Sequence, residues 1–321
     1  MIEKPVCAVI IPCFNEEEVI NITCTQLFNV LKNLIETEKI AQSSYICFVD
    51  DGSQDRTWEI ITELSKNKNT GVEVKGLKLS RNFGHQAAML AGLTQNEADI
   101  FITIDADLQD DINVISQMID KYLEGFEVVY GVRNDRSSDG FLKRHISQLY
   151  YKLAKYLEVE GIFNHADFRL MSKRVVNILR NLKECNIYLR GLVPSLGFKS
   201  CSVYFSRKKR IAGTAKYNFF SLSSLAIDGI TSFSIKPLRL ITVLGFICFC
   251  IAIAMSIFSI VSYFYLRKVP GWSSLFFSIY LLGGIQLLSI GILGEYIGKI
   301  YKETKQRPKF IVEKTADEEF Q

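Results

Sequence analysis

The stretch that decides the fold is Asp99-Ile100-Phe101-Ile102-Thr103-Ile104-Asp105-Ala106-Asp107-Leu108-Gln109-Asp110. Its apolar, β-branched first half predicts a buried strand of a parallel sheet, and this strand ends abruptly in Asp105-x-Asp107. Two neighbouring carboxylates cost too much free energy to bury unless a positive group lies between them. Because open α/β sheets bind ligands at the carboxyl ends of their strands, the stretch indicates a divalent cation that carries a phosphorylated ligand. The alternative is an acidic, solvated turn.

The residues on either side repeat an alternation of strand and helix. The predicted strands are residues 6–11, 45–49, 72–79, 100–104 and 127–132, and the predicted helices include residues 17–38, 85–93 and 114–123. This order is typical of a doubly wound, mainly parallel α/β sheet. The first four strands end in polar or charged residues, and Arg133 follows the fifth. The carboxyl edge of the sheet is therefore predicted to be a polar crevice.

Length and charge limit the classes of function. A chain of 321 residues has room for about two domains, and its net charge of +4 is too small to suggest nucleic acid as a partner. The eight cysteines form no Cys-x-x-Cys pair, which is typical of reduced core thiols in a cytosolic protein.

The last third of the chain has the composition of a membrane anchor. Residues 240–266 and 272–293 contain no charged side chain, and each stretch is long enough to span a bilayer. Residues 219–236 have one apolar helical face, which suits a helix lying in the membrane interface or a docked soluble helix. Basic residues flank the pair mainly on its outer sides, so the positive-inside rule predicts a multi-pass protein of the cytoplasmic (inner) membrane with both termini in the cytoplasm. The predicted organisation is a cytoplasmic sheet domain (1–218), an interfacial amphipathic helix (219–236), a transmembrane hairpin (237–300) and a cytoplasmic tail (301–321).

Five ordered motifs resemble those of a known family. They are Pro12-Cys13-Phe14-Asn15-Glu16, Val49-Asp50-Asp51-Gly52-Ser53, Leu79-Ser80-Arg81-Asn82-Phe83-Gly84, Asp105-Ala106-Asp107-Leu108-Gln109-Asp110 and Asp167-Phe168-Arg169-Leu170-Met171. With these motifs and its tail, the chain resembles family 2 inverting glycosyltransferases, most closely the polyprenyl-phosphate group that includes bactoprenol glucosyltransferases. The resemblance implies a GT-A fold for residues 1–218.

The resemblance also implies roles for individual residues. The nucleotide-sugar set is Pro12, Asn15, Glu16, Asp50, Asp51, Arg81 and Asp105. Asp105, Asp107 and Gln109 match the family's metal turn, and an all-oxygen set suits Mg²⁺ or Mn²⁺. Such an ion neutralises charge as the nucleoside diphosphate leaves, which gives Asp107 a catalytic role. Capping of a helix is the alternative for the Asp50-Asp51 turn.

Basic residues supply the expected phosphate contacts. The predicted phosphate-binding set is Arg133, Arg169, Arg207, Arg210 and Lys216. An arginine binds phosphate oxygens in a bidentate manner, although the cluster from Arg207 to Lys216 also suits a juxtamembrane patch on anionic lipid. His85 and His165 are interpreted as structural.

Asp167 matches the family's proposed catalytic base. A lipid phosphate is already largely ionised near neutral pH, so little proton abstraction is needed, and Asp167 has an alternative role in orienting the acceptor or Arg169. The family's usual proline after the metal turn is Asp111 here, and Asn164 and Ala166 also depart from its pattern.

The expected reaction is transfer of glucose from UDP-glucose to undecaprenyl phosphate, with inversion, for modification of O-antigen or another surface glycan. Mannose, aminoarabinose and N-acetylglucosamine stay open as alternatives, as does a non-catalytic nucleotide-binding membrane scaffold. The two apolar helices are too few for one chain to form a transport path, which argues against a flippase. Relatives form homo-oligomers, so a homo-oligomer such as a tetramer is a further expectation.

Overall fold

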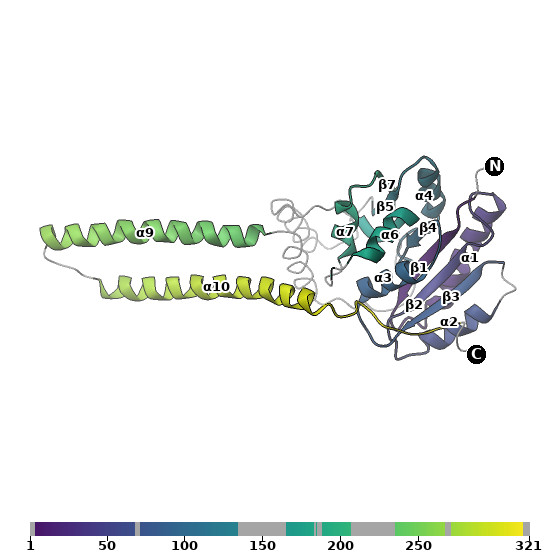
Figure 1. The fold of residues 1–321 in the computed structure, drawn as a ribbon, viewed down its shortest axis with the longest axis horizontal. Helices are drawn as coiled ribbons and strands as arrows, with labels where there is room; N and C mark the ends of the chain where they lie inside the picture. The colour runs from purple at the N-terminus through teal and green to yellow at the C-terminus, as the bar shows by residue number, and fades with distance from the viewer. Residues whose placement is uncertain are drawn as a thin grey trace. The chain divides into compact units, whose positions relative to one another are not determined.

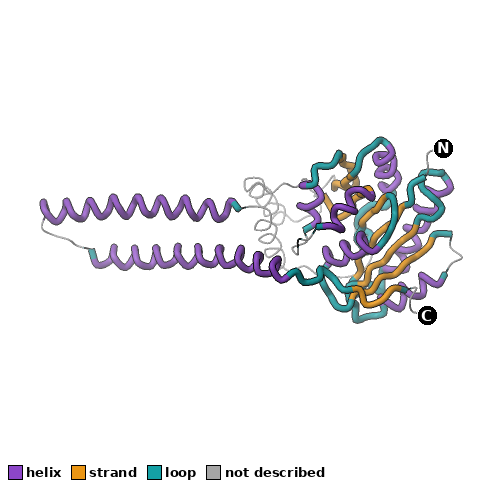
Figure 2. Tube along the Cα trace, in the orientation of Figure 1, coloured by secondary structure: helices purple, strands orange, loops and turns teal. Residues whose placement is uncertain are grey.

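The computed structural model describes residues 4–67, 71–133, 165–182, 184, 188–206, 235–266 and 271–316. Its centre is an eight-stranded sheet in the order β7-β5-β6-β4-β1-β2-β3-β8 (Figures 1 and 2). The strands are β1 (Cys7–Cys13), β2 (Tyr45–Asp50), β3 (Glu73–Leu79), β4 (Ile100–Thr103), β5 (Val128–Arg133), β6 (His165–Ser172), β7 (Ser200–Phe205) and β8 (Val312–Thr315). The helices are α1 (Ile20–Glu36), α2 (Thr57–Lys66), α3 (His85–Gln95), α4 (Val114–Leu123), α6 (Lys173–Asn181), α7 (Leu189–Ser195), α9 (Lys236–Leu266) and α10 (Trp272–Lys305).

The strands alternate their side chains between two hydrophobic layers. On β1, Val9 and Ile11 pack with residues of α1, α2 and α4, whereas Ala8 and Ile10 pack with residues of α3, α6 and α7. All four of these side chains are fully buried. A sheet that is covered by helices on both faces needs near-continuous apolar strands, which explains why the sequence of β1 contains no charge.

The sheet is mainly parallel, as the sequence predicts. Strand β1 lies parallel to both β2 and β4, β2 lies parallel to β3, and β5 lies parallel to β7. Two strands run the other way: β6 lies antiparallel between β4 and β5, and β8 lies antiparallel to β3 at the edge. Neither β6 nor β8 is predicted as a strand from the sequence, and α7 is also not predicted.

The chain divides into two compact units. One contains the sheet with its helices and the returning residues 306–316, and the other contains α9 and α10. Residues 219–234 of the predicted interfacial helix lie outside the described residues.

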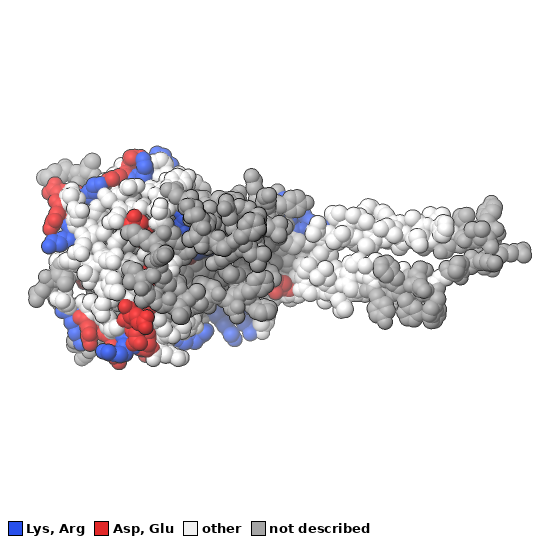
Figure 3. All heavy atoms as spheres, turned by 180° about the vertical axis from the view of Figure 1, so that it is seen from behind, with Lys and Arg blue, Asp and Glu red and all other residues white. Residues whose placement is uncertain are grey.

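Helices α9 and α10 form the second unit. The segments Lys236–Met255 and Leu281–Lys305 are long and apolar enough to cross a membrane, by length and composition. Their apolar side chains are exposed, with 66% of Phe246 and 72% of Leu287 accessible. Figure 3 shows the described part of this helix pair almost free of charged residues over most of its length. These two helices confirm the apolar pair expected from the sequence.

Candidate functional site

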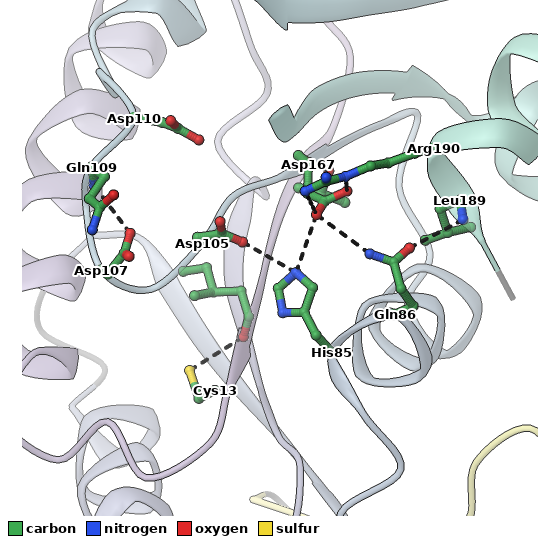
Figure 4. A network of polar contacts seen from close by, with 12 residues as sticks. Cys13, His85, Gln86, Asp105, Asp107, Gln109, Asp110, Asp167, Leu189 and Arg190 are labelled. Atoms are coloured by element: carbon green, nitrogen blue, oxygen red, sulfur yellow. Dashed lines mark hydrogen bonds and ion pairs between the residues drawn. The ribbon is translucent and has the colours of Figure 1, made fainter. Parts of the chain in front are cut away.

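The carboxyl end of β4 and the amino end of β6 bring two of the predicted site residues together (Figure 4). Thr103 of β4 pairs with Arg169 of β6 in antiparallel register. Asp105 follows Thr103 by two residues, and Asp167 precedes Arg169 by two residues. The antiparallel direction of β6 therefore places Asp167 at the same edge of the sheet as the Asp105-x-Asp107 turn, although the two aspartates are far apart in sequence.

His85 lies between these two carboxylates. Its Nε2 atom is 3.3 Å from Asp105 Oδ1 and 3.7 Å from Asp167 Oδ2. Burial favours neutral imidazole, but hydrogen bonding to the two aspartates and their negative charge are stronger and hold the pKa of His85 well above its usual value. His85 begins α3, directly after the turn that follows β3, so the fold brings a third loop to this edge.

Asp167 is the centre of a wider network. Its Oδ1 accepts hydrogen bonds from Arg169 Nη2 at 2.7 Å and Arg190 Nε at 3.1 Å. Its Oδ2 accepts from Arg190 Nη2 at 2.7 Å and from Gln86 Nε2 at 3.5 Å. Burial alone would raise the pKa of Asp167, but the charge of Arg190, the hydrogen bonds from His85 and Arg190 and the charge of Arg169 hold that pKa well below its usual value. Both carboxylate oxygens already accept hydrogen bonds from arginine side chains, so this geometry favours the orienting role over that of a base.

Arg169 does not lie where the sequence-based assignment to phosphate requires. Its side chain is fully buried, with Nη2 on Asp167 and Nη1 donating to the Leu189 carbonyl at 3.0 Å. No edge of this guanidinium faces the crevice, so the structure gives Arg169 a structural role instead. The sequence could not show this, because an arginine two residues after an aspartate on a strand points to the same face whether that face is open or covered.

The turn after β4 has the donor chemistry of a hard-cation site. Asp107 Oδ1 accepts a hydrogen bond from the Gln109 backbone N–H at 3.2 Å. Leu108 between them has a φ of 51°, a left-handed conformation that a leucine rarely adopts and that is often found at functional sites. Among the described residues, no cluster of three His, Cys, Asp or Glu side chains forms a complete metal cage.

Orphaned carboxylate oxygens support a cation at this turn. Asp110 Oδ2 is buried without a hydrogen-bond donor among the described residues, and the buried Asp105 Oδ1 is approached by His85 Nε2 at the long distance of 3.3 Å. Buried carboxylate oxygens without donors are costly, and a divalent ion satisfies them. The residues thus fit Mg²⁺ or Mn²⁺ held by the Asp105-x-Asp107 turn, with ligand oxygens completing the shell.

Arg133 is paired with an aspartate at the same edge. Its Nε and Nη2 atoms donate to Asp110 Oδ1 at 3.2 and 3.0 Å. Burial raises the pKa of Asp110 to about 6, against the opposing charge of Arg133. A quarter of the Arg133 side chain is exposed, and part of its guanidinium group is bound to Asp110. Arg133, which was predicted to bind phosphate, therefore has only part of its guanidinium group accessible.

The turns after β1, β2 and β3 form the predicted nucleotide end of the site. Asp51 Oδ1 and Oδ2 accept the backbone N–H groups of Phe83 and Gly84 at 2.7 and 2.9 Å, which ties the β2 turn to the turn before α3. Asp50 is fully buried, and its Oδ1 accepts the Ser53 N–H at 3.1 Å while its Oδ2 has no donor among the described residues. Asp51 therefore ties two turns together, whereas one buried oxygen of Asp50 has no donor among the described residues.

The other predicted nucleotide residues lie around these two aspartates. Asn15 has a φ of 52° and donates its N–H to Ser53 Oγ at 2.9 Å, and the Glu16 N–H donates to Thr57 Oγ1 at 2.9 Å. Pro12 is a buried residue of β1, and the Arg81 guanidinium lies 4.2 Å from the centre of the Phe83 ring. Hydrogen bonds thus join the β2 turn to the β1 turn on one side and to the β3 turn on the other.

The remaining predictions fall outside the described residues, and some site residues were missed. Arg207, Arg210 and Lys216 lie outside the part of the chain that the structure describes. His85, interpreted from the sequence as structural, lies in the polar network, and so do Gln86 and Arg190, which no sequence motif predicts. The position of His85 directly after a strand-end turn was an available signal, whereas Arg190 follows no strand and had none.

Comparison with known proteins agrees with this geometry. Residues 8–179 match the model of glycosyl transferase family 2. The chain is 49% identical over 313 residues to the uncharacterized glycosyltransferase YkoT of Bacillus subtilis (strain 168), covering 97% of this chain and 92% of the relative. It is 40% identical to a prophage bactoprenol glucosyl transferase homolog of Escherichia coli (strain K12), covering 96% and 98%. It is also 39% identical to an SfII prophage-derived bactoprenol glucosyl transferase of Shigella flexneri, covering 96% and 97%.

These matches extend over almost the whole chain, including its apolar helices, so the similarity is not confined to the sheet. The mainly parallel sheet with its acidic turn after β4 is accordingly a GT-A fold. The chain belongs to glycosyl transferase family 2 and is a glycosyltransferase.

Proposed function

We propose that the protein transfers glucose from UDP-glucose to undecaprenyl phosphate at the cytoplasmic face of the membrane. The observation that carries the proposal is the juxtaposition of the Asp105-x-Asp107 turn with the Asp167–Arg190 pair at one sheet edge. The first element has the oxygen donors for a cation on a nucleoside diphosphate, and the second presents positive charge to an anionic acceptor. The names of relatives that are about 40% identical support glucose and bactoprenol as the two substrates.

The residues divide the work of an inverting displacement. The buried Asp50 receives the nucleotide, and Asp105 and Asp107 hold Mg²⁺ or Mn²⁺, which when bound neutralises charge on the leaving diphosphate. An oxygen of the lipid phosphate attacks the anomeric carbon on the face opposite the diphosphate. The bond to the diphosphate oxygen breaks, and the configuration inverts. Asp167 stays ionised and orients the arginine beside the acceptor instead of removing a proton.

The two apolar helices give this reaction its location. A polyprenyl phosphate remains at the bilayer surface, so an enzyme that uses it benefits from an anchor in the same membrane. In this proposal α9 and α10 cross the membrane as a hairpin, and both termini lie in the cytoplasm. The product, a polyprenyl-phosphate sugar, serves as a donor for modification of O-antigen or another surface glycan.

The test uses purified full-length protein in detergent with undecaprenyl phosphate, Mg²⁺ and separate radiolabelled nucleotide sugars. We expect label from UDP-glucose to pass into the organic phase, and we expect EDTA or Asp107→Asn to abolish this transfer. Asp120→Asn is the matched control, because Asp120 pairs with Lys39 on the surface of the domain. Transfer from GDP-mannose alone, or from UDP-N-acetylglucosamine alone, would show that the donor sugar is mannose or N-acetylglucosamine and not glucose. UDP binding without transfer from any donor would contradict the lipid-phosphate acceptor and favour the scaffold.

A further inference from the structure

Arg190 is a residue of the polar network that no sequence motif predicts. It lies in α7 and binds Asp167 in a bidentate manner, with Nε at 3.1 Å from Oδ1 and Nη2 at 2.7 Å from Oδ2. The Asp167 side chain is only 4% exposed, whereas that of Arg190 is 40% exposed. The ion pair therefore has one buried partner and one partner that reaches the crevice.

Asp167 carries one negative charge but pairs with two positively charged guanidinium groups, those of Arg169 and Arg190. The fully buried Arg169 also donates to Asp167, at 2.7 Å, and a buried guanidinium requires a nearby carboxylate. One carboxylate thus serves two guanidinium groups, while His85 is shared with Asp105. The Nη1 atom of Arg190 makes no hydrogen bond with any residue that the structure describes, so an N–H edge and a net positive charge are left for an anion.

The place of Arg190 relative to the strands of the sheet favours the acceptor over the nucleotide. The strands that carry the predicted nucleotide residues, β1 and β2, lie on one side of β4, and β6 lies on the other. In Figure 4, Asp107 and Arg190 lie on opposite sides of Asp105, His85 and Asp167. An inverting displacement brings the nucleophile and the leaving group to opposite faces of the reacting carbon. With the diphosphate at the Asp105-x-Asp107 turn, as in the proposed function, this arrangement puts Arg190 on the side from which the nucleophile would enter.

Neighbouring contacts fix Arg190 in advance of binding. The Leu189 N–H donates to Gln86 Oε1 at 3.2 Å, and the Leu189 carbonyl accepts from Arg169 Nη1 at 3.0 Å. Gln86 also reaches Asp167 at 3.5 Å. The start of α7 and the carboxylate that holds Arg190 are therefore bonded to the same two side chains, which lowers the entropy lost when the guanidinium binds a ligand.

We propose that Arg190 binds the phosphate monoester of the acceptor, with Asp167 and Gln86 as its positioning residues. The inference rests on the proposed function, since it assigns a site to the lipid-phosphate substrate of that reaction. Arginine suits this task because a second N–H edge stays available to phosphate oxygens while the first is held by the carboxylate. Lysine at the same position keeps the charge but cannot bind both partners through a planar fork.

The experiment measures transfer and binding separately on full-length protein in detergent. The variants are Arg190→Lys and Arg190→Gln, with Arg174→Gln as control, because Arg174 is an exposed arginine of α6 outside the crevice. In the transfer assay we expect the KM for undecaprenyl phosphate to rise at least tenfold in Arg190→Lys and further in Arg190→Gln. The KM for the nucleotide sugar is expected to stay within about twofold.

The binding arm needs no transfer. It compares the thermal shift given by a polyprenyl phosphate with that given by the corresponding polyprenol, in the absence of donor. A shift specific to the phosphate in the wild type and in Arg174→Gln, reduced in Arg190→Lys and lost in Arg190→Gln, supports the proposal. Equal shifts in wild type and Arg190→Lys, or a rise in donor KM alone, would overturn it. Absence of transfer with a retained phosphate-specific shift would contradict the proposed function but not the phosphate site.

Discussion

Asp167 and Arg169 form the most deeply buried ion pair in the described part of the domain. Both side chains are almost inaccessible, and the Arg169 Nε atom is buried without a hydrogen bond to a described residue. Removal of one partner from a buried pair leaves an uncompensated charge, which costs more than the intact pair contributes. The low pKa of Asp167 and the stability of the domain thus have the same origin.

Asp167→Asn is expected to lower the free energy of unfolding by about 3–5 kcal/mol, since it strands the buried Arg169 guanidinium. Unfolding by guanidinium chloride, followed by far-UV circular dichroism, measures this loss of stability. Asp120→Asn removes a half-exposed partner of Lys39 and is expected to cost less than about 1 kcal/mol. If the two variants lost equal stability, the buried pair would not have the structural role assigned to it.

The buried carboxyl group of Asp50 is expected to make the stability of the domain depend on pH. Burial raises its pKa, with the hydrogen bonds from Ser53 opposing that effect. A carboxyl group whose pKa is higher in the folded state than the ordinary 3.8 favours folding at low pH, and this contribution is lost as pH rises through the folded pKa. At neutral pH the ionised Asp50 is therefore destabilising until a ligand satisfies it.

Asp50→Asn keeps an oxygen for the Ser53 N–H and removes the buried charge. We expect the ligand-free variant to be more stable than the wild type at pH 7.5, with the difference shrinking as pH falls toward 4, while UDP binding weakens at least tenfold. Unfolding midpoints at several pH values and calorimetric titration with UDP measure the two effects. A variant less stable than the wild type at every pH would show that the Asp50 charge makes a favourable contact instead.

At the scale of elements, the sequence predicted the strands that are apolar along their whole length. Strands β1, β2 and β4 are buried on both faces, so their residues had to be continuously hydrophobic, and their ends had to be polar. Strand β6 (His165–Ser172) was missed because its charged residues Asp167 and Arg169 are buried, whereas the charged residues of β3 remain at least partly exposed. Its polar residues serve the site and its alternate residues serve the core, so the pattern reflects function as much as fold.

Strand β8 and Arg190 could not be predicted from the sequence for a different reason. A four-residue strand with two charges carries no periodicity of its own, and it forms because the edge of β3 offers unpaired backbone groups. Arg190 enters the site because α7 packs beside β6, a tertiary relation that no local spacing encodes. The sequence could thus identify strand-end residues, which a sheet brings together by rule, but not residues placed by helix packing.

A substitution at Ala316, the buried residue directly after β8, tests how tightly this strand is packed. The Ala316 N–H donates to the Gly76 carbonyl at 2.9 Å, and Ala316 is 1% exposed. A Cβ built on Gly76 would lie 3.0 Å from the Ala316 Cβ and 2.7 Å from Ile61, so the space is full. Ala316→Leu is therefore expected to destabilise the domain by about 1–3 kcal/mol through overpacking.

The measurement is the unfolding midpoint, with Glu313→Gln as control because Glu313 lies on the same strand with an exposed side chain. Hydrogen exchange at the backbone of β3 provides a second readout, since loss of β8 would leave that edge without its partner. Unchanged exchange in an Ala316→Leu variant of lower stability would mean that β8 stays docked and that the cost arises only in the core.

At the scale of the whole molecule, the chain separates a charged sheet unit from an apolar helix pair. Residues of the sheet unit include the entire polar network, and those of α9 and α10 include most of the exposed large apolar side chains. An exposed apolar surface of this extent is unfavourable in water and favourable in lipid. The reaction chemistry and the membrane location are therefore predicted to be separable by deletion.

Replacement of residues 236–305 by a long, flexible Gly/Ser linker tests this separation while keeping residues 306–316 and hence β8. We expect the variant to remain in solution without detergent and to bind UDP like the wild type, because the hydrogen bonds that hold the predicted nucleotide turns lie within the sheet unit. With a short, water-soluble prenyl phosphate as acceptor, its kcat/KM is expected to stay within about tenfold of the wild type. With undecaprenyl phosphate in liposomes, the wild type is expected to be at least a hundredfold faster, because it shares the bilayer with its acceptor. Loss of transfer to both acceptors, despite normal UDP binding, would show that the helix pair contributes to the acceptor site itself and not only to the location of the enzyme.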